Sequence, residues 1–75
     1  MTDTTLRLRR IVSLARHALT LALPLLEEDR EQLVMSEFRW METRDLSKLD
    51  ETSRKAIACY DEAIAAIREA LAATP

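Results

Sequence analysis

The chain has 75 residues, no glycine and a formal net charge of −2, and 48% of its residues are hydrophobic. It has a single cysteine, Cys59, and a single histidine, His17, which excludes a disulfide framework and metal sites built from Cys/His clusters. A chain this short buries little surface by itself. We therefore expect one domain that is stabilised by association with another chain.

The first predicted element is one long helix from about Thr4 to about Thr43. Its apolar residues recur at spacings of three and four, which is typical of one helix face, and Thr2, Asp3 or Thr4 would cap its start. Pro24 removes a backbone donor and crowds the preceding turn. We predict a kink there rather than a loop, because no Gly, Asn, Asp or Ser surrounds it.

A turn is predicted at about residues 44–49, where turn and cap residues are concentrated. Ser47 and Asp50 within this stretch have the spacing of a capping box. A second helix follows over about residues 50–73, with an apolar repeat close to 3.5 residues, the period of left-handed antiparallel packing. The predicted fold class is all-α: residues 1–75 form a single antiparallel helical hairpin with a long kinked helix and a shorter one.

The two predicted helices differ in length, which leaves apolar residues near the N-terminus without a neighbour in the hairpin. The run from Ala18 to Leu26 is also apolar on nearly every side of a helix, which indicates burial all round. A second copy of the chain, giving a four-helix bundle, would cover both regions. The predicted dimer interface comprises Leu8, Ile11, Val12, Ala15, Leu19, Ala22 and Leu26. The alternatives are a three-helix monomer broken at Pro24 and a complex with a different protein.

The sequence offers little for catalysis. His17 has no orienting group beside it for a nucleophile dyad. The acidic block at residues 27–31 lacks the Glu-x-x-His pairs of carboxylate metal sites, and a phosphate-binding loop needs glycine, which the chain lacks. We expect a non-enzymatic protein with no catalytic residue, no metal and no cofactor.

Charge is unevenly distributed along the chain. The candidate phosphate contacts are the N-terminal arginines Arg7, Arg9, Arg10 and Arg16. A dimer would double them and give a salt-dependent affinity for nucleic acid. Because the acidic block follows directly and no basic stripe continues, we rank nucleic acid below protein as a partner.

The aromatic residues Phe38 and Trp40 are two positions apart and so about 200° apart on a helix, which means that one hairpin core cannot bury both. We predict that Phe38 is the structural ring, since Val34 and Met41 continue its stripe, and that Trp40 is the binding ring. The predicted partner-binding surface consists of Met35, Phe38, Arg39, Trp40, Met41 and Arg44. Burial of the second ring in the dimer is the alternative.

The apolar run at residues 18–26 is too short to span a membrane, which takes about 20 apolar residues. Arg16 and His17 interrupt the apolar run that a secretory signal would need, and no small-residue cleavage site follows. We expect a cytoplasmic protein with no membrane contact and with a reduced Cys59.

Two segments, residues 22–28 (ALPLLEE) and residues 60–64 (YDEAI), resemble in style the small helical accessory proteins encoded by bacteriophages, prophages and plasmids. The resemblance covers most of the chain and transfers no functional residue. It implies a protein-binding regulator or inhibitor of a host protein. The architecture also resembles small plasmid-encoded hairpin dimers that bind RNA, but a comparable basic face across both helices is missing. A structural assembly subunit is a third possibility.

Overall fold

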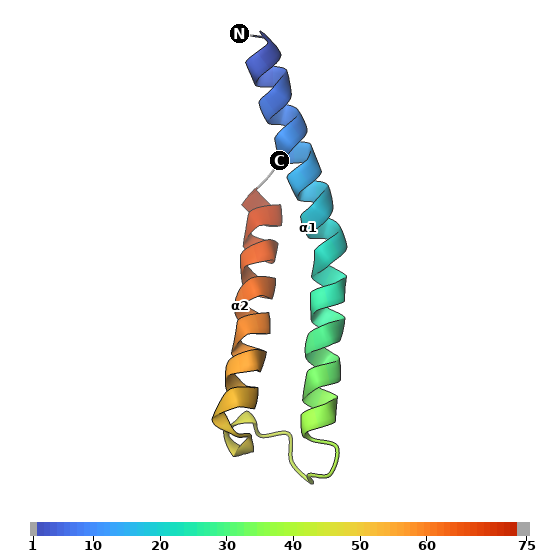
Figure 1. The fold of residues 1–75 in the computed structure, drawn as a ribbon, viewed down its shortest axis with the longest axis vertical. Helices are drawn as coiled ribbons and strands as arrows, with labels where there is room; N and C mark the ends of the chain where they lie inside the picture. Colours follow the sequence, from blue (N-terminus) through green and yellow to red (C-terminus); the bar gives the residue numbers. More distant parts are fainter. Residues whose placement is uncertain (1, 74–75) are drawn as a thin grey trace.

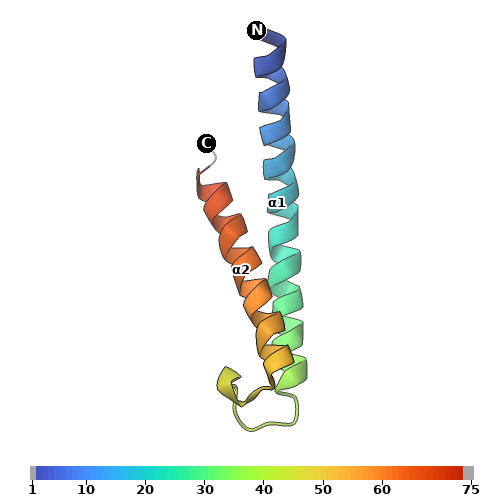
Figure 2. The same cartoon turned by 60° about the vertical axis from the view of Figure 1, so that its left-hand side comes forward.

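The computed structural model describes residues 2–73, which form an antiparallel helical hairpin (Figures 1 and 2). Its elements are α1 (Thr2–Glu37), a short 3-10 helix η1 (Leu46–Lys48) and α2 (Glu51–Ala73). No strand occurs within residues 2–73. The predicted all-α hairpin class is confirmed.

Helix α1 is a single α-helix of 36 residues that contains Pro24. Both views show it running through this region without a break (Figures 1 and 2). The three-helix monomer broken at Pro24 is therefore wrong. Pro24 has no backbone N–H to donate, but the helical turns before and after it keep the helix continuous. The helix also begins earlier than predicted, so Asp3 and Thr4 lie within it and do not cap it.

The end of α1 at Glu37 corrects the prediction of a helix to about Thr43. The backbone N–H of Phe38 still donates to the Val34 carbonyl at 3.0 Å, and the next bonds are those of a tight turn, from Met41 to Phe38 at 3.1 Å. Phe38 turns inward against Leu49 in the core. A helix continued past this point would run beyond the start of α2, so the hairpin connection covers residues 38–50 and not only residues 44–49.

Two aspartates cap the helices that follow. The Asp45 carboxylate accepts from the Ser47 backbone N–H at 3.0 Å at the start of η1, and the Asp50 carboxylate accepts from the Ser53 N–H at 2.7 Å at the start of α2. The predicted capping box is wrong, because Ser47 lies inside η1 and Asp50 is itself the cap. The hydrogen bond from the Ser53 backbone lowers the pKa of Asp50, and that from the Ser47 side chain lowers the pKa of Asp45.

We predict that Asp50→Asn weakens the acid dependence of folding. The pKa of Asp50 in the folded chain lies below its usual value of 3.8, so its stabilisation is complete above that value and is lost as pH falls through the lower folded pKa. Asparagine caps a helix without titrating. Melting temperatures by circular dichroism should therefore fall less between pH 4 and about pH 2 in the variant. Glu62→Gln, at an exposed carboxylate on the outer side of α2, is the control, and an equal flattening there would contradict the role of the cap.

The core lies at the closed end of the hairpin. Val34, Phe38, Leu49 and Ile57 form a buried cluster, and Leu33 packs against it. Farther along α2, within the described residues, only Ile64 is buried. The helices are therefore held together most firmly beside the connection, and their contact becomes shallower toward the end of α2.

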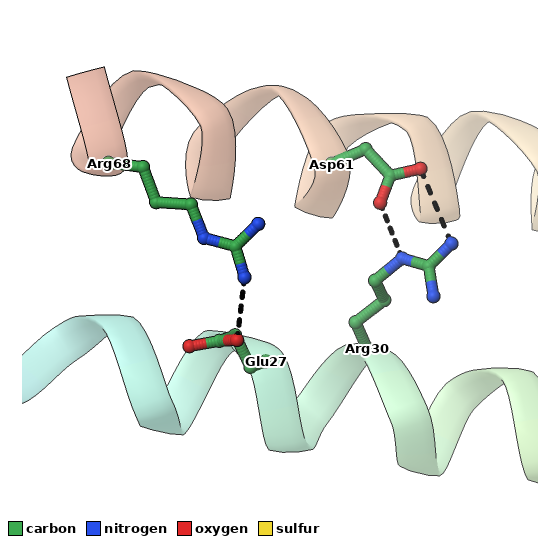
Figure 3. Close-up of polar contacts among 4 residues, drawn as sticks. All are labelled: Glu27, Arg30, Asp61 and Arg68. Carbon is green, nitrogen blue, oxygen red and sulfur yellow. Dashed lines mark hydrogen bonds and ion pairs between the residues drawn. The ribbon is translucent and has the colours of Figure 1, made fainter.

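Two ion pairs join the middle of the helices on one side (Figure 3). Arg30 of α1 binds Asp61 of α2, and Arg68 of α2 binds Glu27 of α1 at 2.8 Å. The order of charges is reversed between the pairs, so a slide of α2 by seven residues would bring Asp61 beside Glu27. Exposed pairs such as these are each worth about 1 kcal/mol or less. Their main contribution is to select the register, and they mark one flank of the hairpin as polar.

Candidate functional site

The connection at the closed end carries the most exposed large hydrophobic side chain among the described residues. Trp40 is 87% exposed and lies in the turn that follows α1. The Arg39 guanidinium lies over its ring, 5.1 Å from the ring centroid. An indole left in water, with a cation stacked on one face, presents the kind of anchor that dominates protein interfaces.

Phe38 does not belong to this exposed surface. It is 5% exposed and packs with Val34, Leu49 and Ile57. This burial is what the predicted structural ring requires, and a side chain buried in this way adds nothing to an exposed docking surface. Phe38 keeps the hydrogen bond of a last helical turn to Val34 and lies on the same buried face, whereas Trp40 lies in the turn after α1 has ended at Glu37.

The remaining predicted partner-binding residues are exposed. Met35 is 48% exposed and lies on α1 just before the connection, and Met41, in the turn, is 39% exposed. The Arg44 guanidinium lies 3.8 Å from the Glu31 carboxylate in an exposed ion pair. We define the tip surface as Met35, Arg39, Trp40, Met41 and Arg44. It has the composition of a docking surface: soft apolar side chains and a tryptophan beside arginines.

A second candidate surface is the N-terminal part of α1, which extends beyond the end of α2 (Figures 1 and 2). Contact between the helices ends near Arg16, whose Nη1 donates to the Leu71 carbonyl at 2.9 Å. We define residues 2–15 as the overhang. Its large apolar residues are all more than half exposed: Leu6, Leu8, Ile11, Val12 and Leu14. The predicted mismatch between the two arms of the hairpin is confirmed.

The exposed apolar surface continues along α1 on the side away from the ion pairs. Leu21 and Leu25 are 57% and 62% exposed. We did not predict them as interface residues, although their spacing from Leu14 and Ala18, in steps of four, three and four, was a usable signal.

The seven predicted dimer residues fall into two groups. Leu8, Ile11, Val12 and Ala15 are exposed. Leu19, Ala22 and Leu26 are half-buried, at the helical spacing that faces α2, so α2 already covers much of their surface.

The four candidate phosphate contacts do not form one basic face. Arg7, Arg9 and Arg10 are exposed, and steps of 100° per residue place Arg9 about 160° from Arg7 and 100° from Arg10. Arg16 is bound to the Leu71 carbonyl. A phosphate backbone would meet at most two of these arginines side by side.

Within residues 2–73 no group of three or more His, Cys, Asp or Glu side chains is placed to hold a metal ion. The helices of this part of the chain are also too polar for any of them to cross a membrane. No protein-family model, no curated protein and no solved structure matches the chain.

Proposed function

We propose that the protein is a non-enzymatic regulator or inhibitor that binds another protein through the tip surface and acts as a homodimer joined through α1. The observation that carries the first half is Trp40, 87% exposed in a chain whose other ring at this end is buried. Truncating a tryptophan anchor at an interface often costs 2 kcal/mol or more. Arg39 and Arg44 would form the polar rim of this contact.

The dimer is supported by the apolar surface of α1. Monomeric proteins rarely expose large contiguous apolar patches, whereas the overhang and the adjoining part of α1 expose seven large apolar side chains, each by more than half: Leu6, Leu8, Ile11, Val12, Leu14, Leu21 and Leu25. A second copy would cover them in a four-helix bundle. We further propose, from the style of the sequence, a cytoplasmic accessory protein of phage, prophage or plasmid origin that modulates a host protein.

Trp40→Ala tests the tip. Affinity capture from an extract of the source organism with wild type and variant, each before and after nuclease treatment, identifies what is bound. With the purified partner we expect the dissociation constant of the variant to be at least 30-fold higher than that of the wild type, which corresponds to a loss of about 2 kcal/mol of binding free energy. Glu69→Ala, which truncates an exposed residue on the outer side of α2 far from the tip, is the control.

The outcomes separate the candidate functions. A protein bound equally by wild type and Trp40→Ala would contradict the tip as the docking site. Capture that disappears with nuclease and depends on Arg7, Arg9 and Arg10 would favour the nucleic-acid alternative. We expect only weak, strongly salt-dependent nucleic-acid binding, because these arginines point in different directions.

A further inference from the structure

We infer that a second copy of the chain packs antiparallel on α1, so that residues whose numbers add up to 39 lie at the same level. This rests on the homodimer proposed above and specifies its geometry. The axis of the pair then falls midway along α1, between Leu19 and Thr20, and the two 36-residue helices overlap over their full length.

The contact surface is a seam of heptad spacing. Ile11, Leu14, Ala18, Leu21 and Leu25 follow one another at steps of three, four, three and four, the repeat of a left-handed coiled coil. All five are exposed in the hairpin. In the antiparallel register Leu14 lies at the level of Leu25 of the second copy, and Ala18 at the level of its Leu21, so these layers pair seam residues with seam residues. Ile11 lies at the level of Glu28, which is the next position of the same repeat after Leu25.

The seam is distinct from the stripe of α1 that packs on α2. At 100° per residue the two stripes are centred roughly 110° apart around α1. This is close to the right angle between the two neighbours of a helix in a four-helix bundle. One face of α1 therefore serves its own hairpin, and the next face is available to the second copy.

Charge selects the antiparallel direction. A parallel pair would place Arg7 and Arg10 beside their own copies and the acidic block beside its copy. In the antiparallel register Arg7 and Arg10 lie at the levels of Gln32 and Asp29 of the second copy, within a turn of Glu28. In residues 2–73 no ion pair occupies Arg7, Arg10, Glu28 or Asp29. Opposite charges thus meet at both ends of the pair.

In the second copy, the side of the hairpin opposite its ion pairs has room for the overhang. The ion pairs of Glu27 and Arg30 with α2 lie on one flank, and the seam lies on the other. On α2 this second flank carries small residues at heptad spacing: Ala56, Cys59, Ala63 and Ala66. Small side chains allow close approach of another helix. The antiparallel register lays each overhang along residues 24–37 of the other α1, directly beside this small-residue flank.

Disulfide trapping tests the register in full-length chains that carry Cys59→Ala. A disulfide needs Cα atoms within about 7 Å. In the antiparallel pair Leu14→Cys faces Leu25→Cys of the other copy, whereas two Leu14→Cys residues are separated by roughly 16 Å along the axis. Mixing the two variants in a glutathione buffer should give the covalent heterodimer, and Leu14→Cys alone should stay monomeric on a non-reducing gel. Lys55→Cys, on the outer side of α2, controls for random collision.

Two results would overturn the inference in different ways. A dimer in which Leu14→Cys links to itself as readily as to Leu25→Cys would reject the antiparallel register but leave the proposed dimer standing. If light scattering shows a monomer at tens of micromolar and the cysteine variants do not link selectively, both the antiparallel register and the dimer are rejected. Neither result bears on the tip surface, which the Trp40→Ala comparison tests separately.

Discussion

Replacing Phe38 with alanine is expected to lower the free energy of unfolding by roughly 3–5 kcal/mol. The ring is 5% exposed and packs against Val34, Leu49 and Ile57 in the buried cluster of the described hairpin. The cluster joins both helices to the connection between them, so the cavity would lie where the hairpin is held together most firmly. Since small domains are stable by about 5–15 kcal/mol, this loss would leave the hairpin close to unfolding.

Trp40→Ala is the matched control for Phe38→Ala, since it removes an aromatic ring only two residues away. Because Trp40 is 87% exposed, its removal should change stability by no more than about 0.5 kcal/mol. Urea titrations followed by circular dichroism, at one fixed protein concentration because association shifts apparent stability, measure both variants. Equal losses in the two variants would show that Trp40 also contributes to the core or to a dimer contact.

The double substitution Leu21→Asp/Leu25→Asp is expected to convert the proposed dimer into a folded monomer. Both side chains are more than half exposed in the hairpin, so carboxylates at these positions remain solvated in the separated chain. In the dimer four unpaired carboxylates would be buried, and each buried charge costs several kcal/mol. The dissociation constant should rise by at least about 1,000-fold, which corresponds to about 4 kcal/mol. Light scattering coupled to gel filtration measures the mass.

Ala65→Asp is the control for this variant. Ala65 is exposed on the outer side of α2, away from α1 and from the seam, so its carboxylate should leave the dimer intact. A wild type that elutes as a stable monomer would refute the dimer, and a double variant that stays dimeric would move the contact to another face. Leu19→Asp is a less informative choice because Leu19 is half-buried toward α2, and its replacement would also weaken the hairpin.

The helices and their unequal lengths were predictable because they follow from periodicity and from the absence of glycine. The position at which α1 ends was not. Residues 38–43 have ordinary helix propensity and no local breaker, and the buried cluster that joins Phe38 to Leu49 and to Ile57 of α2 is a tertiary contact that propensity does not reveal. The cap was misassigned for a related reason: the segment contains two aspartates, and only the structure shows that each begins its own helix.

The candidate surfaces were predictable to a similar degree. The separation of Phe38 from Trp40 followed from their spacing, although Trp40 lies in the turn after the helix has ended. The apolar run at residues 18–26 does not reveal which of its residues face α2 and which are exposed. Leu19 and Leu26 fall on the stripe facing α2, whereas Leu21 and Leu25 fall on the exposed seam. When nearly every residue of a run is apolar, the pattern of burial depends on the direction from which α2 approaches, which the run itself does not specify.

The tip and the overhang lie at opposite ends of a rod whose longest extent is 60 Å (Figure 1). An antiparallel pair therefore presents its two Trp40 residues at opposite ends, on the order of 60 Å apart. One small partner cannot engage both, so each dimer would bind two partner molecules independently. Avidity would arise only for an assembly whose own sites are spaced to match, because effective concentration vanishes when a rigid spacer cannot reach both sites. The dimer would thus bind an assembly whose sites repeat at a matching distance more tightly than it binds a single isolated partner.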